Sequence, residues 1–147
     1  MDNDATIINA LRKKGYKATA QRIAISRFAL TSREHPSARR ICREIRDTHP
    51  TVSLATVYKT LQVFKELGLV NQLTFPEEEA RFDSYVKPHL NLICEKCSNI
   101  TDIEDQSAQE VISAAKNARF VVSGVRIDVR GICQKCAKRD GTFQGSK

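Results

Sequence analysis

Two C-x2-C pairs place the strongest constraint on how this chain can fold. Cys94 pairs with Cys97 and Cys133 pairs with Cys136, which accounts for four of the five cysteines among 147 residues. A two-residue gap lets both thiolates of a tight turn reach one ion, and four thiolates complete the tetrahedral shell of structural Zn(II). Because this set leaves no open position for a substrate, the pattern predicts a zinc site that stabilises the fold and performs no chemistry.

Other uses of the cysteines are less compatible with the rest of the sequence. A C-x2-C pair can be a thioredoxin-like redox motif, but two pairs of equal spacing outside a βαβ pattern favour metal. Disulfides would need an oxidising compartment. Residues 1–4 lack the features of a secretion signal, and no apolar run approaches the about 18 residues of a membrane span, so we expect a reduced, cytoplasmic protein. Cys42 lies in a helical segment and is interpreted as a small buried hydrophobe.

Positive charge is concentrated in the first half of the chain. Residues 1–75 contain 13 Lys and Arg residues against 6 Asp and Glu residues, a net charge of +7, whereas residues 76–147 contain 11 of each. Such an asymmetry is typical of nucleic-acid binding, with a membrane surface or an acidic protein as weaker alternatives. The sequence therefore predicts a basic, nucleic-acid-binding half joined to a neutral half that contains the cysteine pairs.

The basic half is predicted to be helical, because its apolar residues recur at helical spacing between start and stop signals. Thr19, Ser37 and Ser53 stand where N-caps would bond the first free backbone N–H groups. Gly15 and Gly68 stand at two predicted C-termini. The predicted helices span residues 6–14, 19–31, 37–48 and 53–68.

The segment after the fourth helix predicts a β-hairpin. Residues 69–74 alternate weakly in polarity, residues 76–79 form a polar turn, and residues 81–85 can return as the second strand. A helical head followed by a hairpin is a winged helix, in which the fourth helix would be the DNA-recognition helix.

The outward face of that fourth helix carries side chains suited to DNA. Tyr58 and Lys59 can reach base edges or thymine methyl groups. Hydroxyl and basic groups that suit phosphate oxygens are those of Ser53, Thr56, Arg12, Lys13 and Lys14. The alternative is a merely solvated helix face, which periodicity does not exclude, but the charge asymmetry and the wing favour DNA.

The neutral half is predicted to be a small α/β module. Residues 90–94 and 100–103 read as strands joined at the first cysteine pair, residues 106–116 as a helix, and residues 120–130 as a longer strand. A sheet of about three strands with one helix leaves an edge that a symmetric partner can complete. The expected fold class for the whole chain is therefore α+β.

Taken in order, these motifs resemble the ferric uptake regulator family over almost the whole chain. The matching elements are residues 11–19 with Arg22, residues 35–38, residues 55–58 with Leu61, residues 81–83, His89 and the two cysteine pairs. The resemblance implies a winged-helix DNA-binding domain over residues 1–82 and a dimerisation and metal-binding domain over residues 83–147. It also implies a homodimer that binds an inverted-repeat operator in double-stranded DNA and represses transcription when metal is bound. The predicted DNA-binding residues are Arg12, Lys13, Lys14, Thr19, Arg22, Ser53, Thr56, Tyr58 and Lys59.

The resemblance further implies a regulatory metal site formed by His35, Asp83, His89, Asn91 and Asp102. Asn91 stands where the family usually has the second histidine of an H-x-H pair. This mixed nitrogen and oxygen set suits Fe(II), Mn(II) or Zn(II). An ion bonded to both halves would fix the angle between them, so metal binding and DNA binding would be linked.

Asp102 points to one branch of the family. Iron sensors tend to have glutamate at this position and peroxide sensors aspartate, so the chain is similar to the peroxide-responsive repressors. The implied mechanism begins when Fe(II) in the site reacts with hydrogen peroxide. This reaction oxidises a ligand histidine, either His35 or His89, and the protein then releases its operator. Zn(II) or Mn(II) would support DNA binding without this sensitivity.

Three alternative functions compete with this one. A zinc hydrolase or deaminase needs an open ligand position and a nearby glutamate, which the complete cysteine set does not provide, so we expect neither an enzyme nor a small-molecule substrate. A protein-interaction zinc module would leave the basic half unexplained. Within the regulators, the alternative is an iron- or zinc-uptake repressor that does not respond to peroxide.

Overall fold

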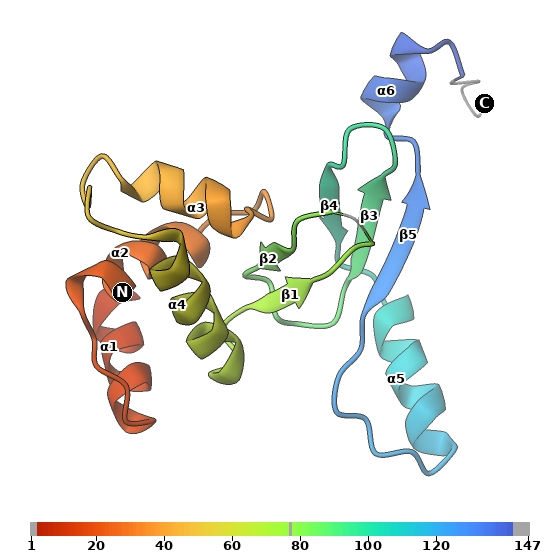
Figure 1. Cartoon of the computed structure of the whole chain (residues 1–147). Coiled ribbons are helices and arrows are strands. Elements are labelled where there is room, and N and C mark those ends of the chain that lie inside the picture. The colour runs from red at the N-terminus through yellow and green to blue at the C-terminus, as the bar shows by residue number, and fades with distance from the viewer. Residues whose placement is uncertain (1–2, 77, 143–147) are drawn as a thin grey trace. The chain divides into compact units, whose positions relative to one another are not determined.

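The computed structural model describes residues 3–76 and 78–142. These residues form six helices and five strands, which confirms the predicted α+β class (Figure 1). The chain divides into two compact units, Met1–Val86 and Lys87–Lys147. Within the described residues, no helix is both long and apolar enough to cross a membrane.

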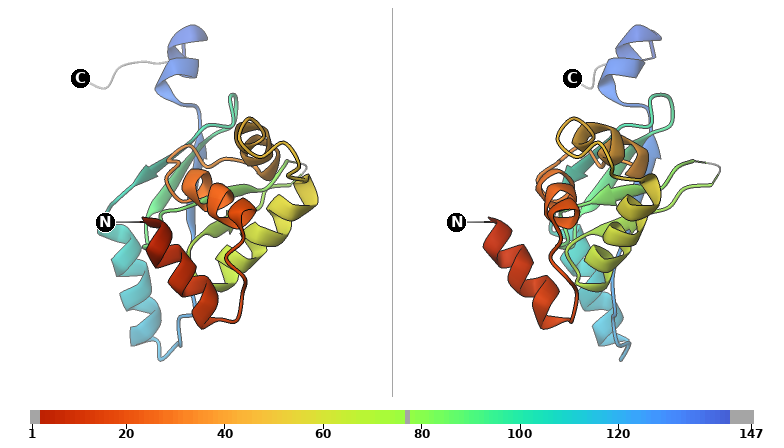
Figure 2. Two further views of the ribbon diagram at one scale, coloured as in Figure 1. Left: turned by 90° about the vertical axis from the view of Figure 1, so that its left-hand side faces the viewer. Right: turned by 60° about the vertical axis from the view of Figure 1, so that its left-hand side comes forward.

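The first unit is built on the helices α1 (Asn3–Lys13), α2 (Ala20–Ala29), α3 (Ala38–Ile45) and α4 (Leu54–Glu66). Helix α2 packs against the other three, and α3 also packs against α4 (Figure 2). The predicted helices are confirmed, although α1 begins three residues earlier than expected and each helix ends one to three residues sooner.

Capping explains where these helices begin and end. The side-chain oxygens of Thr19, Ser37 and Ser53 each accept a hydrogen bond from the backbone N–H three residues later. A cap of this kind stabilises a helix by about 1 kcal/mol. Gly15 and Gly68 take φ angles of +80° and +68° just after α1 and α4, a conformation that strains residues with a Cβ atom.

The first unit has a continuous apolar core to which all four helices contribute. Leu11 of α1, Ile25 of α2, Ile41 of α3 and Phe64 of α4 are each 0% exposed. Cys42 lies in the same cluster, as predicted for a small buried hydrophobe. The core holds one side of α4 inside, so that its opposite side faces solvent.

A short hairpin completes the first unit. Strand β1 (Asn71–Leu73) pairs with β2 (Arg81–Asp83) in antiparallel register, with Gln72 opposite Phe82. Phe82 belongs to the helical core, and its backbone N–H donates to the carbonyl of Pro36 at 3.0 Å. Helices and hairpin together form the predicted winged helix, with strands shorter than expected.

The second unit is a small sheet with two helices. Its strands β3 (Leu90–Cys94), β4 (Ile100–Ile103) and β5 (Ile127–Gly131) lie in the order β4-β3-β5 among the described residues. Strand β3 is antiparallel to β4 and parallel to β5. Helix α5 (Ser107–Asn117) lies in the connection from β4 to β5, and α6 (Gln134–Arg139) follows β5. The predicted strands at residues 90–94 and 100–103 are confirmed.

Two features of this unit differ from the sequence prediction. The strand expected at residues 120–130 begins only at Ile127, because β3 has five residues and pairs with residues 127–131 alone. The preceding residues carry β-branched side chains but find no strand partner, and Val121 is 90% exposed. Helix α6 was not predicted; it begins directly after Cys133, so the second cysteine pair lies at a helix N-terminus.

Candidate metal centres and nucleic-acid interface

The four cysteines of the two C-x2-C pairs converge in the second unit. Cys94 ends β3 and Cys97 lies in the turn before β4, while Cys133 precedes α6 and Cys136 lies within it. Their sulfur atoms all lie within 4.8 Å of one another, and the Sγ atoms of Cys97 and Cys133 are 3.8 Å apart. Four thiolates bound at about 2.3 Å to one tetrahedral ion would be about 3.8 Å apart, so the cluster fits a structural Zn(II).

The electrostatics of the cluster also suit a cation. The backbone N–H of Cys133 donates to the Cys94 sulfur at 3.3 Å and, with the N–H of Cys97, lowers the pKa of Cys94 to about 6. The hydrogen bond with the Cys133 thiol, together with burial, raises the pKa of Cys136 to about 12. The first proton therefore leaves the cluster easily, whereas removal of the last needs positive charge at the centre.

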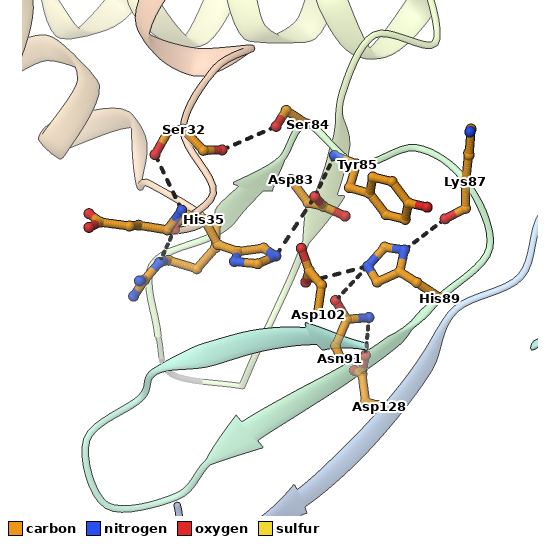
Figure 3. A network of polar contacts seen from close by, with 12 residues as sticks. Ser32, His35, Asp83, Ser84, Tyr85, Lys87, His89, Asn91, Asp102 and Asp128 are labelled. Atoms are coloured by element: carbon orange, nitrogen blue, oxygen red, sulfur yellow. Dashed lines mark hydrogen bonds and ion pairs between the residues drawn. The ribbon is translucent and has the colours of Figure 1, made fainter. Parts of the chain in front are cut away.

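A half-site with one nitrogen and two oxygen donors lies at the start of β3 (Figure 3). The Nδ1 atom of His89 is 2.7 Å from the carbonyl oxygen of Lys87, which only accepts, so Nδ1 carries the hydrogen. Nε2 is then turned toward Asn91 Oδ1 at 3.2 Å and Asp102 Oδ1 at 3.6 Å. Metal-bound histidines usually donate their other ring N–H to an acceptor of this kind. The arrangement therefore fits a divalent ion at Nε2.

A second half-site lies in the first unit. The Nε2 atom of His35 is 3.7 Å from Oδ1 of Asp83, and the two residues are 2% and 3% exposed. His35 has a φ angle of 48°, which strains a non-glycine residue, and its carbonyl oxygen accepts a hydrogen bond from Arg81 Nε at 2.6 Å. Asp83 Oδ1 accepts the backbone N–H of Tyr85 at 2.7 Å. The fold thus holds an imidazole and a carboxylate side by side at the cost of local strain.

The five predicted regulatory ligands therefore fall into two sets. His35 lies beside Asp83 in the first unit, and His89 lies beside Asn91 and Asp102 in the second. Imidazole, carboxylate and amide oxygen together suit Fe(II), Mn(II) and Zn(II). The third histidine, His49, belongs to neither set; its Nδ1 atom lies 3.0 Å from the hydroxyl of Thr48.

A groove on the first unit collects four of the predicted DNA-binding residues. The groove has a volume of about 400 Å³, and Thr19, Arg22, Thr56 and Lys59 are among the residues that line it. Arg22 donates from Nη1 to the carbonyl of Lys17 at 2.8 Å, which fixes the guanidinium beside the groove. The groove is therefore lined by cationic and hydroxyl groups from the start of α2 and the outer face of α4.

The other predicted DNA-binding residues lie outside this groove. Arg12, Lys13 and Lys14 are exposed at the end of α1, and Ser53 caps α4. Tyr58 is 41% exposed, and its hydroxyl faces Glu79 Oε1 at 3.5 Å. None of these residues is among those that line the groove.

Five residues that line the groove were not predicted as DNA contacts, namely Gly15, Tyr16, Lys17, Gln21 and Thr60. The Tyr16 ring lies 5.6 Å from the Arg22 guanidinium carbon, and its hydroxyl donates to Glu66 Oε2 at 2.6 Å. The contact with Glu66 joins residues 50 positions apart in the sequence, so hydrophobic periodicity gives no signal for it.

Comparisons with known proteins agree with this architecture. The model of the ferric uptake regulator family matches residues 13–130. The chain is 38% identical over 135 residues to the peroxide-responsive repressor PerR of Staphylococcus epidermidis, covering 91% of this chain and 89% of that protein. It is 37% identical over 134 residues to the peroxide operon regulator of Bacillus subtilis, covering 90% and 92%. The structure of a Campylobacter jejuni peroxide stress regulator matches with a TM-score of 0.69 at 29% identity, covering 88% and 98%. The chain belongs to the ferric uptake regulator family.

Proposed function

We propose that this protein is a metal-dependent, DNA-binding transcriptional repressor that releases its operator when hydrogen peroxide oxidises a histidine of its regulatory metal site. The observation that carries the proposal is that two buried histidines, His35 and His89, each lie beside a carboxylate. The names of the relatives from Staphylococcus epidermidis and Bacillus subtilis, which are peroxide regulators, support this choice over a metal-uptake repressor.

We infer two metal sites per chain. Cys94, Cys97, Cys133 and Cys136 would hold a structural Zn(II) ion, which the distances between their sulfur atoms support. The regulatory ion would be held by His35, Asp83, His89, Asn91 and Asp102, drawn from both units. Fe(II) bound there would supply the electron that splits the O–O bond of hydrogen peroxide into hydroxide and a hydroxyl radical, which can oxidise a nearby imidazole. Mn(II) and Zn(II) do not readily supply that electron.

The protein's own groups determine the outcome of that chemistry. The carbonyl of Lys87 holds His89 with Nδ1 protonated, so that Nε2 is the nitrogen available to metal. An imidazole that has gained oxygen is a poorer ligand, so the link between the two units is lost. Metal binding and DNA binding are linked: if bound metal raises the affinity for DNA, bound DNA raises the affinity for metal by the same factor. Loss of the metal therefore lowers the affinity for the operator.

The DNA interface of this proposal is the groove on the first unit and the basic surface around it. Lys59 and Thr56 project from the outer face of α4, the helix that a winged helix places in the major groove. Arg22 and the exposed cluster Arg12–Lys14, which are four of the 13 cationic side chains in residues 1–75, would contact phosphates.

Lys59→Ala should weaken binding to the operator by about 1–3 kcal/mol and weaken binding to unrelated duplex DNA much less, because a side chain that reaches base edges distinguishes sequences. Lys65→Ala is the matched control, since Lys65 lies on the same helix but contacts Gln72 at 3.1 Å. Fluorescence anisotropy with both duplexes at a fixed salt concentration measures the two losses. Equal losses on both duplexes would mean that Lys59 contacts only phosphate.

We also propose a homodimer that binds an inverted repeat, with residues 1–82 as the DNA-binding domain and residues 83–147 as the dimerisation and metal-binding domain. Apolar side chains exposed on the second unit support this division: Ile103 (41%), Val111 (49%), Phe120 (68%), Val129 (45%) and Ile132 (44%). Exposed apolar side chains that form one patch mark a protein–protein interface. Two DNA-binding units related by a two-fold axis would then match the two half-sites of the inverted repeat.

His89→Ala should abolish the dependence of operator affinity on added Mn(II), whereas His49→Ala should leave it intact. The reason is that His89 supplies a nitrogen donor to the regulatory site, whereas the ring nitrogen Nδ1 of His49 lies beside the hydroxyl of Thr48. Coupling between two sites typically changes affinity 5- to 150-fold. In His89→Ala, the ratio of operator affinities with and without Mn(II) should fall to about one. Anisotropy titrations with and without Mn(II) measure it; unchanged coupling in His89→Ala would contradict the ligand assignment.

A further inference from the structure

A polar row crosses the sheet of the second unit and contains one residue without an assigned role. Asn91 of β3 stands opposite Asp102 of β4 and opposite Asp128 of β5. Residues directly opposite one another on neighbouring strands point to the same face of a sheet. Asp102 and Asn91 belong to the proposed regulatory site, whereas Asp128 lies one strand further away.

The contacts of Asn91 determine which end of its amide faces His89 (Figure 3). Its Nδ2 atom lies 3.2 Å from Asp128 Oδ1 and 3.4 Å from the carbonyl oxygen of Ile127. Both partners only accept hydrogen bonds, so they must face the NH2 group of the amide. The amide oxygen is therefore the atom that faces His89 Nε2 at 3.2 Å, and Asn91 is 2% exposed.

Asp128 is itself held in place. Its Oδ1 atom accepts from Arg126 Nε at 2.9 Å, and its Oδ2 atom lies 2.6 Å from Arg126 Nη2. A guanidinium that contacts both oxygens of a carboxylate fixes the plane of the carboxylate as well as its position. Asp128 keeps 23% of its side chain exposed, so it is not part of the buried half-site.

We propose that Asp128 is a positioning residue that fixes the amide oxygen of Asn91 toward the regulatory metal and so favours Mn(II) and Fe(II) over Zn(II). The inference rests on the proposed function, because it needs a metal at His89 and Asn91. Without Asp128 the amide can turn by half a rotation and present NH2, which cannot bind a cation. An amide oxygen in place of an imidazole nitrogen favours ions that prefer oxygen ligands.

The test is the affinity of purified, zinc-containing protein for added Mn(II), measured by the electron paramagnetic resonance signal of free Mn(II). Asp128→Ala should bind Mn(II) about 10-fold more weakly, the usual scale for loss of a group that supports a metal ligand. Asp128→Asn should bind within about threefold of the unaltered protein, because one carbonyl oxygen can still accept from Asn91. Glu104→Ala removes an exposed acidic side chain after β4 and is the control for net charge.

A double-mutant cycle separates positioning from general structural damage. In an Asn91→Ala background, Asp128→Ala should cause no further loss of Mn(II) affinity, because the group it positions is already absent. Zinc content and melting temperature, measured on the same samples, report whether the variants fold. Competition with Zn(II) should show that Asp128→Ala loses more affinity for Mn(II) than for Zn(II).

The outcomes distinguish the two proposals. If the unaltered protein binds no Mn(II) beyond its zinc, the proposed function fails. If the unaltered protein binds Mn(II) and Asp128→Ala binds it equally well, the regulatory site stands and the positioning role is wrong. A loss that persists undiminished in the Asn91→Ala background would also overturn the positioning role.

Discussion

Cys136→Ser should remove the zinc and unfold the second unit while the first unit stays folded. The described residues of the second unit bury few apolar side chains, chiefly Ile93, Ile100 and Ala108, whereas the continuous core cluster belongs to the first unit. A small unit with so little core depends on other sources of stability. Structural Zn(II) in small domains supplies about 10–16 kcal/mol of apparent binding free energy, which is folding free energy.

The measurements are metal analysis and circular dichroism during thermal unfolding. Zinc should fall from about one ion per chain to near zero, and one of two unfolding transitions should disappear. Cys42→Ala is the matched control, because Cys42 lies in the apolar core of the first unit and its change should leave the zinc in place. A Cys136→Ser protein that retains its zinc, or an unaltered protein without zinc, would contradict the assignment of the cluster.

Fe(II)-loaded protein should lose about 100-fold in operator affinity after a short treatment with low hydrogen peroxide, and Mn(II)-loaded protein should lose almost none. A factor of this size lies within the usual range of coupling between two ligand sites. The physical reason is that only the iron-loaded site can pass an electron to peroxide, after which His35 or His89 is oxidised and binds metal poorly.

Anaerobic anisotropy titrations before and after peroxide measure this effect. Adding fresh Fe(II) or Mn(II) to the oxidised sample should not restore binding, because the change is covalent. Full recovery on adding metal would mean that peroxide only removed Fe(II) from the site. Equal insensitivity of both samples, with metal-dependent binding intact, would indicate a metal-uptake repressor instead.

Local signals in the sequence were enough to predict most of the fold. Thr19, Ser37 and Ser53 cap their helices as predicted, because capping depends on residues only three positions apart. The strands at residues 90–94 and 100–103 also match, since the first cysteine pair forces a tight turn between them. The last strand was predicted too long because β propensity at residues 120–126 cannot compensate for the lack of a partner strand.

The site was predictable in its residue types and only partly in its contacts. The cysteine spacing predicts a four-thiol cluster without further information, and the structure brings those sulfur atoms together. The role of Asp128 depends on the register between β3 and β5, which are separated by a long connection, so the sequence pattern carries no sign of it. The same holds for Tyr16, whose partner Glu66 is 50 residues away.

The most direct test of peroxide sensing is peptide mass spectrometry after Fe(II)-loaded and Mn(II)-loaded samples are treated with hydrogen peroxide. Trypsin places the three histidines in separate peptides, residues 34–39 for His35, 47–59 for His49 and 82–96 for His89, because Lys87 precedes a proline and is not cut. We expect one added oxygen on the His35 or His89 peptide of the iron sample alone, with the His49 peptide unchanged. No added oxygen on either peptide, with DNA binding intact, would contradict the account.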